Sequence, residues 1–414
     1  MSSHKSIGLV KISRKDSLII DLLPSNELRS SIVRNLISAF GLDDQARIPG
    51  VELISYSRST IDEIASFHDR DYAQVLLEKR DWSTYISDIS RNQPLIVEKL
   101  KALGKSLNEE TSDVDGDGNS SSSLSKYCLE FDCPVFPFLD EYVKITAGTT
   151  IASVQWLLKQ TCEGPIAINW TGGRHHTHRD RASGFCYVND IVIGILRLRS
   201  KFSKVMYIDM DIHHGDGVAS AFKYTNKVLT CSIHRFEVGF FPGTGQKPRD
   251  GLGKGQGYEI NVPTMKGLNN SSLHWIVENI VLTLVDEFRP SAVVLQCGGD
   301  GLCTDSNFSE WNLTLKGYSD AVITILKHIK VPALLLGGGG YNNVETSKLW
   351  CLITGELLIG KDKCMEWDML PDSVDFELIG SDEITFWQND KVKNIKDRNT
   401  SGYLKSLREQ IFSR

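Results

Sequence analysis

The hydrophobic residues of this chain form short continuous runs, and the segments between the runs carry apolar residues at helical spacing. Five of the runs end in polar residues, and they cover 165–169, 204–210, 228–234, 292–300 and 332–341. Helical spacing recurs over 188–198, 271–288, 313–327 and 344–359. Strands of a parallel sheet are covered on both faces and need no polar alternation. The pattern therefore predicts an α/β fold, with a central and mostly parallel sheet that carries helices on both faces.

The N-terminal part of the chain follows the same pattern. Short strands are predicted at 7–12, 18–22 and 51–56, and helices at 26–40, 60–79 and 146–159. The helix at 26–40 ends at Gly41, as helices commonly do, and the one at 60–79 has a polar break near His68. Spacing alone predicts that Arg29 and Arg34 are surface charges on the first of these helices.

Polar residues at the strand ends form the most unusual part of the sequence. The run at 204–210 leads into Asp209-Met-Asp-Ile-His-His-Gly-Asp216. A lone Asp or His in such a place is most often a hydrogen-bonded core residue. Three acids and two histidines within eight residues favour chemistry instead. Ligands of open α/β sheets bind beyond the carboxyl ends of the strands. We therefore expect a site built from loops that are distant in sequence.

A metal site is predicted at this rim of loops. Side chains alternate along a strand, so Asp209, Asp211 and His213 project to one face, and carboxylates beside an imidazole suit a divalent ion. Asp300 closes another apolar run, behind glycines that allow close backbone approach, and is the natural third ligand. Asp211, His213 and Asp300 would leave a zinc-like ion one open position for water, which is typical of a catalytic site.

Groups that could move protons or stabilise charge lie at other strand ends. A water acidified by a metal needs a neighbouring base, and His175 and His176 are the candidates. Asp209 and Asp216 could each hold one imidazole, which suits general base and general acid roles. Tyr341 follows four glycines and could donate a hydrogen bond to a developing oxyanion. A phosphate-binding loop is not favoured there, because the lysine of that motif is missing.

Composition narrows the class of protein. The chain has 414 residues, a net charge of -6 and a pI of about 6.0, which argues against nucleic-acid binding as its main role. Nine cysteines without CxxC pairs indicate reduced intracellular thiols. No apolar run is long enough to span a membrane, and no signal peptide is evident. These features predict a cytosolic or nuclear protein.

Two segments differ in composition from the rest of the chain. Residues 106–125 are rich in Asn, Asp, Gly and Ser and are predicted to be a flexible insertion. Within it, 113–119 imitates the start of a calcium-binding loop, but Leu124 stands where that loop needs a bidentate Glu. We predict one catalytic domain over 5–380 and a C-terminal tail over 381–414. The tail has helical spacing at 403–412, so packing back as a helix and fraying are both open.

Five motifs in order resemble the class I zinc-dependent histone deacetylases. They are Trp170-Thr-Gly-Gly-Arg-His-His176, Ala182-Ser-Gly-Phe-Cys-Tyr-Val-Asn-Asp190, Asp209-Met-Asp-Ile-His-His-Gly-Asp-Gly217, Gly239-Phe-Phe-Pro-Gly-Thr-Gly245 and Gly337-Gly-Gly-Gly-Tyr-Asn342. The resemblance runs from about Ile7 to Gly360. It implies a single arginase-like α/β domain and hydrolysis of acetyl-lysine to lysine and acetate, with Zn²⁺ as the ion and Fe²⁺ as an alternative. The substrates implied are acetylated histone tails or other acetylated proteins, and the compartment is the nucleus, with the cytoplasm as a second one.

The resemblance also implies roles for residues that spacing leaves open. Phe185 and Phe241 would line a narrow tunnel, Gly184 would offer its carbonyl to the substrate amide, and Asp132 would hold the substrate backbone. Arg29 matches an arginine of an internal acetate channel, contrary to the surface position that spacing predicts. Two structural potassium sites are implied, one at Asp209, Asp211, His213, Ser232 and Ile233, and one at Phe222, Thr225, Val228 and Tyr258.

The sequence departs from the family pattern at three places. Gly299 replaces a usual alanine before Asp300, Arg174 replaces a usually apolar residue, and 305–311 differs in sequence and length. Members that need a corepressor and an inositol phosphate carry arginines where this chain has about Ser306 and Val344. The nearest match is therefore the stand-alone branch, which holds the eighth animal member and the fungal Hos-type enzymes. The alternative is that the substitutions at about Ser306 and Val344 are neutral loop variation. In that case other basic residues, such as Lys348, would compensate for the missing arginines.

The residues alone are also compatible with other functions. An amidohydrolase that acts on acetylated polyamines or other small acetylamides would use the same chemistry. A catalytically inactive acetyl-lysine-binding scaffold would be expected to lose Tyr341 or a metal ligand, and none is lost. An arginase-type enzyme would use two manganese ions and more carboxylates, so the single ligand set argues against it.

Overall fold

A single sheet organises the described part of the chain. The computed structural model describes residues 6–80, 94, 97–99, 121–305, 310–380 and 384–413. Within these ranges nine strands lie in the order β2-β1-β3-β9-β8-β4-β5-β7-β6. All neighbours pair in parallel except β6, which runs antiparallel to β7. The strands are β1 (Ile7–Val10), β2 (Val51–Ile54), β3 (Ile166–Asn169), β4 (Val205–Asp209), β5 (Val228–Arg235), β6 (Arg249–Asp250), β7 (Glu259–Thr264), β8 (Ala292–Gln296) and β9 (Ala333–Leu336).

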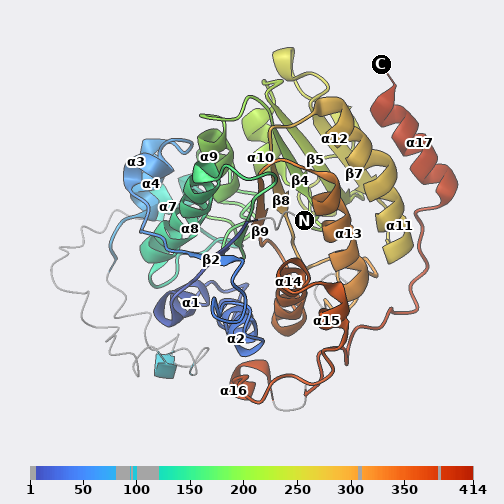
Figure 1. The fold of residues 1–414 in the computed structure, drawn as a ribbon. Coiled ribbons are helices and arrows are strands. Elements are labelled where there is room, and N and C mark those ends of the chain that lie inside the picture. Colours follow the sequence, from blue (N-terminus) through green and yellow to red (C-terminus); the bar gives the residue numbers. More distant parts are fainter. Residues whose placement is uncertain are drawn as a thin grey trace.

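Helices cover both faces of the sheet (Figure 1), as the pattern of apolar runs predicts. One face packs against α8 (Leu139–Lys159), α9 (Asp190–Leu198) and α10 (Asp216–Phe222). The other packs against α2 (Arg29–Ala39), α11 (Asn270–Ile276), α12 (Leu282–Phe288), α13 (Leu315–His328) and α14 (Asn343–Leu358). Successive strand residues serve opposite faces: Tyr207 belongs to the first layer and Ile208 to the second. Burial on both faces explains why the strands read as continuous apolar runs.

The predicted strand at 18–22 is wrong, because these residues belong to α1 (Arg14–Ile20) and the turn after it. The Ser13 side chain accepts a hydrogen bond from the Asp16 N–H and so caps the helix. Leu18, Ile19 and Ile20 are all buried in a second core cluster. A short apolar run that is buried on every side does not distinguish a strand from a helix.

Other elements differ from the prediction mainly in extent. The segment 60–79 forms α3 (Ile61–Ile64) and α4 (Arg70–Leu76), with His68 buried between them. The segment 271–288 is α11, a π-helical turn (Val277–Val281) and α12. The short β6 and the sequence of β7, which begins with Glu259 and contains Pro263, gave no clear strand pattern.

The C-terminal residues return to the body of the molecule. After α15 (Lys361–Met365) and α16 (Phe376–Ile379), α17 (Ser401–Phe412) lies beside α11 and α12 in Figure 1. Tyr403 Oη donates to the Pro263 carbonyl at 2.5 Å, and an Arg249 N–H donates to the Ile411 carbonyl at 3.0 Å. Leu404, Leu407 and Ile411 are buried in the main core cluster. The helical spacing at 403–412 therefore corresponds to a packed helix.

The predicted insertion lies largely outside the described residues. This holds for 106–120, including the calcium-loop-like stretch 113–119, while the end of the predicted insertion belongs to α7 (Ser121–Lys126).

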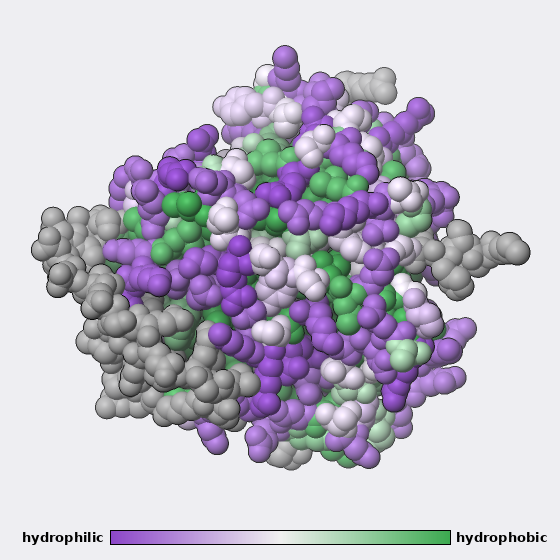
Figure 2. All heavy atoms as spheres, turned by 60° about the vertical axis from the view of Figure 1, so that its left-hand side comes forward, coloured by the Kyte–Doolittle hydropathy of each residue, from purple (hydrophilic) through white to green (hydrophobic). Residues whose placement is uncertain are grey.

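The nine cysteines are all free. Among the described residues, no helix combines the length and apolar character needed to cross a membrane. In Figure 2, hydrophilic side chains dominate the visible face and hydrophobic ones gather in small groups.

Candidate active site

Four neighbouring strands deliver the candidate residues to one edge of the sheet. The strands β3, β9, β8 and β4 are adjacent and parallel, so their carboxyl ends meet. The loop after β3 carries His175 and His176, and the loop after β9 carries Tyr341. The loops after β8 and β4 carry Asp300 and the pair Asp211 and His213. Parallel pairing thus brings residues 175 and 341, far apart in sequence, to the same rim.

Asp211, His213 and Asp300 form a buried cluster that could hold a metal ion. Their ligand atoms all lie within 4.8 Å of one another. The Nδ1 of His213 is 3.2 Å from Asp211 Oδ1 and 3.0 Å from Asp300 Oδ2. Strand alternation predicted that Asp209 projects to the same face as Asp211 and His213. Asp209 is the last residue of β4, and its carboxylate contacts His175 rather than joining this cluster.

The surroundings of this cluster fit a divalent cation. Burial and the neighbouring Asp211 carboxylate raise the pKa of Asp300 to about 7, because two negative charges crowd one apolar-walled space. A cation between the carboxylates would relieve this repulsion. The Gln296 amide and the Gly339 N–H donate to Asp211 Oδ2 at 2.9 and 2.8 Å and fix its orientation. A set of two carboxylates and one imidazole suits zinc or iron.

Each histidine of the pair is held by its own carboxylate. His175 Nδ1 lies 2.8 Å from Asp209 Oδ2, and His176 Nδ1 lies 2.7 Å from Asp216 Oδ1. The Tyr207 hydroxyl donates to Asp209 Oδ2 at 2.6 Å. Each Nε2 atom is thereby on the side of its ring that faces away from the carboxylate bound to Nδ1, and His175 Nε2 lies 3.8 Å from Asp211 Oδ1.

The two imidazoles differ in charge preference. Burial alone would lower the pKa of His175, but the Asp209 and Asp211 carboxylates outweigh it and raise the pKa to about 9. Burial and the nearby His175 lower the pKa of His176 to about 4, although Asp216 opposes this. The ring centroids are only 3.9 Å apart, so one ring discourages protonation of the other.

A cavity of about 180 Å³ leads to the metal-binding cluster. Its walls are formed by Asp132, His176, Gly184, Phe185, His213, Phe241 and Tyr341. The His176 and Phe241 ring centroids lie 4.9 Å apart, and those of Phe185 and Tyr341 lie 5.9 Å apart. A Cβ at Gly184 would approach His176 to 2.5 Å, so only glycine fits beside this ring. The residues that the resemblance assigned to a tunnel thus lie together.

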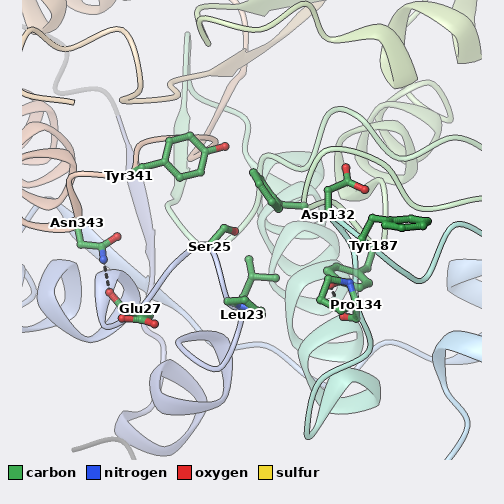
Figure 3. A pocket seen from close by; sticks show the side chains of 11 residues that line it. Leu23, Ser25, Glu27, Asp132, Pro134, Tyr187, Tyr341 and Asn343 are labelled. Carbon is green, nitrogen blue, oxygen red and sulfur yellow. Dashed lines mark hydrogen bonds between the residues drawn. The ribbon is translucent and has the colours of Figure 1, made fainter. Parts of the chain in front are cut away.

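A second pocket of about 380 Å³ opens beside the tunnel (Figure 3). Tyr341 and Asn343 lie on one side of it, and Asp132, Pro134 and Tyr187 lie on the other. The Asp132 carboxylate accepts a hydrogen bond from the Gly184 N–H at 2.8 Å and is itself exposed. Its second oxygen is therefore available to a group that approaches from outside.

Tyr341 is set by the glycine turn before it. Gly338 and Gly340 have φ values of 158° and 121°. The value at Gly340 in particular is one that residues with a side chain rarely adopt. The Tyr341 N–H donates to Asp305 Oδ2 at 2.7 Å. A Cβ at Gly339 would lie 2.4 Å from Asp300 Oδ2, so this turn can pass the carboxylates only without a side chain.

Arg29 is buried, which corrects the surface position predicted from spacing. Its guanidinium donates to the carbonyls of Gly340 and Gly338 at 2.5 and 2.8 Å and lies over the Trp350 ring. The hydrophobic spacing of the helix could not indicate this, because Arg29 is its first residue and points to the glycine turn after β9. Arg34 is half-buried rather than exposed.

The residues proposed for potassium lie on neighbouring segments. Asp209 and Ser232 are register partners at the ends of β4 and β5. The Thr225 N–H donates to the Phe222 carbonyl at 3.1 Å, between α10 and β5. The Thr230 N–H donates to the Tyr258 carbonyl at 3.0 Å, close to Val228 on β5. Ion binding at either set stays a prediction.

Sequence reasoning missed Gln296 and the position of Arg174. Gln296 is a polar residue at the end of an apolar strand, and this signal could have identified it as a partner of Asp211. Arg174 is buried beside the histidine pair. Of the departures from the family pattern, Gly299 has a local reason, because a Cβ there would approach the Thr346 side chain to 2.8 Å. Residues 306–309 lie outside the described residues.

Lys348 cannot be the surface cation that was suggested to replace missing arginines. It is completely buried, and its Nζ lies 3.0 Å from Glu345 Oε1. The suggestion that Lys348 compensates for the missing arginines is therefore wrong. All residues of α14 from Glu345 to Glu356 are buried, polar ones included, and the helix packs against both α2 and α13.

The α/β sheet and the metal-binding cluster at its rim define a metal-dependent hydrolase. The model of the protein family described as "Histone deacetylase domain" matches residues 23–357 of this chain. The chain belongs to this family and deacetylates lysine. Histone deacetylase 8 of Xenopus tropicalis is 36% identical over 356 residues, covering 86% of this chain and 84% of that protein.

Two further relatives place the chain within the family. Histone deacetylase HOS1 of Saccharomyces cerevisiae is 33% identical over 395 residues, covering 84% of this chain and 82% of that protein. Histone deacetylase 1 of Homo sapiens is 39% identical over 292 residues, covering 70% and 58%. These similarities agree with a class I member near the branch of histone deacetylase 8 and HOS1, as the motifs predicted.

Proposed function

We propose that this enzyme hydrolyses N6-acetyl-lysine in histones or other proteins at the cluster of Asp211, His213 and Asp300. The observation that carries the proposal is the convergence of these three ligand atoms within 4.8 Å at the inner end of the 180 Å³ cavity. Zn²⁺ is the ion we assign to the cluster, and Fe²⁺ is the alternative. Such an ion, when bound, lowers the pKa of a water and polarises a carbonyl.

His176 is the residue to which we assign proton transfer. It lines the cavity, whereas His175 lies behind it and is not exposed to that space. Its Nδ1 is held by Asp216, so its Nε2 can accept the proton of the attacking water and pass it to the departing lysine amine. We assign His175, fixed by Asp209, the role of a buried electrostatic partner that stabilises negative charge as it develops.

The remaining wall residues would bind and orient the substrate. The Tyr341 hydroxyl would donate to the acetyl oxygen as it becomes anionic. The Gly184 carbonyl would accept the substrate amide N–H, while Phe185 and Phe241 would enclose the aliphatic part of the lysine. Asp132, with one oxygen already used by Gly184, would hold a backbone N–H of the peptide at the entrance.

We also propose the finer features that the resemblance implied. Structural K⁺ would occupy the two sets of residues described above, and Arg29 would lie on the path of the released acetate. The catalytic domain would cover 5–380. The enzyme would act in the nucleus, with the cytoplasm as a second compartment, and would need no corepressor, inositol phosphate, nucleic acid or membrane. The names of the relatives support the histone deacetylase class alone and do not bear on these finer features.

An activity panel tests the substrate class. Purified, metal-loaded protein would be assayed on acetyl-lysine peptides and on acetylated polyamines, with the Asp211→Ala variant as the control. We expect turnover of the peptides that is lost in the variant. Preferential turnover of acetylated polyamines would favour a small-molecule amidohydrolase, and binding of peptides without any turnover would favour a scaffold.

A further inference from the structure

The carboxylate of Asp216 lies between two histidines. Its Oδ1 is 2.7 Å from His176 Nδ1, and its Oδ2 is 3.3 Å from the Nε2 of His178. Among the described residues no other group forms a hydrogen bond or an ion pair with this carboxylate. Burial would raise the pKa of Asp216, but the hydrogen bonds from His176 and His178 outweigh burial and hold the pKa well below its ordinary value. Each oxygen of an ionised carboxylate therefore has one imidazole as its partner.

The other carboxylate–imidazole pair is fixed in a different way. Asp209 is completely buried, and in addition to its imidazole it binds the Tyr207 hydroxyl at 2.6 Å and the Asp211 N–H at 3.1 Å. The Asp216 side chain is 13% exposed and has no such buried donors. A carboxylate that is held at one oxygen alone can rotate, whereas one that is held at both oxygens rotates only by losing a hydrogen bond. His178 thus takes the part that Tyr207 and the Asp211 N–H have in the first pair.

The backbone on either side of His178 is fixed by hydrogen bonds and close packing. The Thr177 carbonyl accepts a hydrogen bond from Asn189 Nδ2 at 2.8 Å, and the His178 N–H donates to the Arg181 carbonyl at 3.0 Å. A Cβ at Gly217 would lie 2.5 Å from the Thr177 carbonyl oxygen, so the first turn of α10 packs directly against this backbone. The position of the imidazole relative to the first residue of α10 is therefore set by the backbone.

The charged side chains that follow His178 pair with groups other than Asp216. The guanidinium of Arg179 lies 2.6 Å from Asp69 Oδ1, and that of Arg181 lies 3.0 Å from Asp180 Oδ1, all four side chains being exposed. The His178 side chain, in contrast, is only 19% exposed. Its contact with the carboxylate is therefore more than an exposed surface pair, which would contribute little.

We propose that His178 is a positioning residue for the proton transfer assigned to His176. The proposal rests on the deacetylase function proposed above, and His178 acts through Asp216. By holding Oδ2, the His178 imidazole keeps Oδ1 on the Nδ1 of His176, so that the His176 ring retains the orientation in which it lines the substrate cavity. An imidazole N–H can donate in the neutral ring as well as in the charged ring, so the contact does not require His178 to carry a charge.

Turnover of an acetyl-lysine peptide by the metal-loaded enzyme is the first test. His178→Ala should lower kcat on the order of tenfold, as for loss of a partner that orients an active-site histidine. It should change KM little, because His178 lines neither of the two cavities described above. His178→Gln can place an amide N–H near the position of Nε2 and should recover most of kcat.

The matched control is His274→Gln. It removes an imidazole whose Nε2 also lies 3.3 Å from a carboxylate, that of Glu278, but at an exposed position on α11. This variant should keep the kcat of the wild type.

Proton NMR of the metal-loaded, substrate-free enzyme gives a measurement that does not depend on turnover. A proton shared by an imidazole Nδ1 and a carboxylate is strongly hydrogen-bonded and gives a separate downfield signal. We expect two such signals, one from His176 with Asp216 and one from His175 with Asp209. The signal that disappears in Asp216→Asn belongs to the first pair. His178→Ala should broaden this signal through faster exchange with water and leave the other unchanged, while His178→Gln should leave both as in the wild type.

Normal kcat in His178→Ala would overturn the proposal. A fall in kcat with both NMR signals unchanged would also overturn it, because His178 would then not act through Asp216. Loss of both signals together would assign the effect to general loosening of the site, and a glutamine variant as slow as the alanine variant would show that a donor at this position is not what matters. Either result contradicts the proposal.

Two further points keep the test decisive. If the alanine variant does not fold, His178→Met, which fills similar space without a donor, replaces it in both experiments. If the wild type shows no deacetylase turnover while the NMR signals respond as expected, the proposed function fails, and the positioning of His176 by His178 through Asp216 is still supported.

Discussion

The Nζ of Lys348 lies 3.0 Å from the Oε1 of Glu345, and both side chains are completely buried within α14. Lys348 also donates to the Thr385 carbonyl at 3.3 Å. Replacing Lys348 by Met would leave the Glu345 carboxylate buried without its cation. We expect a loss of about 3–5 kcal/mol in the free energy of unfolding, because breaking a buried pair costs more than the pair contributes. Urea denaturation of the purified variant measures this.

The matched control is the double variant Glu345→Gln/Lys348→Met. It removes both charges at once, so most of the lost stability should return. A double variant that is as unstable as Lys348→Met alone would show that packing of the lysine chain, rather than the unpaired charge, causes the loss.

Activity without an inositol polyphosphate is the second prediction. Lys348 cannot contact a polyanion at the surface, and Val344, at the start of α14, carries no charge. We therefore expect the purified, partner-free enzyme to be active and to respond less than about twofold to added inositol hexakisphosphate. Titration at constant ionic strength measures this response. Negligible basal turnover that rises steeply with the polyphosphate would contradict the prediction.

The third prediction concerns metal content. Asp211→Ala removes one of the three ligand atoms that lie within 4.8 Å of one another. We expect loss of both the bound divalent ion and turnover, with the fold retained. Elemental analysis after gel filtration, together with a peptide deacetylation assay, measures both. Asp62→Ala, at an exposed aspartate, is the control. Full metal occupancy in the Asp211 variant would remove this residue from the ligand set.

The sequence predicted the cluster of Asp211, His213 and Asp300 better than it predicted the burial of Arg29 and the secondary structure of 18–22. Asp211, His213 and Asp300 stood out because charged residues directly follow buried apolar strands, and the parallel order of β8 and β4 places them together. The same rule could not show that Arg29 is buried, since a residue at a helix start is oriented by tertiary contacts. It also misassigned 18–22, because Leu18, Ile19 and Ile20 are all buried in α1, and so short an apolar run does not reveal a helical period.

Stability at low pH should depend on His68. Its Nδ1 lies 3.1 Å from the Arg179 carbonyl, and its Nε2 accepts the Asn189 N–H at 2.9 Å, so the ring is held neutral. Burial lowers its pKa to about 4 from the ordinary 6.5. Below pH 6.5 the unfolded chain binds a proton that the folded chain does not, so the free energy of unfolding falls as pH decreases, until about pH 4.

The expected slope is roughly 1.4 kcal/mol per pH unit in that window. Urea denaturation between pH 4.5 and 7.5 would be compared between the wild type and His68→Gln, which cannot titrate. The variant should be less stable near neutral pH, and its deficit should shrink as pH decreases. Other titrating groups affect both proteins alike, so parallel pH profiles would exclude His68 as the cause.

Tyr341 gives the most direct test of the proposed mechanism. Its ring lies 5.9 Å from that of Phe185 at the cavity wall, and its backbone N–H is fixed by Asp305. Burial and the charges of Asp300 and Asp211 raise the pKa of its hydroxyl well above the ordinary value, so the group stays protonated and can donate. Tyr341→Phe keeps the ring and removes only the donor. We expect kcat to fall about 10²-fold or more with little change in peptide binding, as for loss of one oxyanion donor.

Rapid-quench turnover and fluorescence binding of an acetyl-lysine peptide separate these two quantities. Tyr187→Phe serves as the matched control, since its hydroxyl donates to the Pro134 carbonyl on the wall of the neighbouring pocket and not to the reaction centre. That variant should lose some stability and keep most of its kcat. Near-normal kcat in Tyr341→Phe would mean that the oxyanion is stabilised without this hydroxyl, and a rise in KM alone would assign Tyr341 to substrate binding.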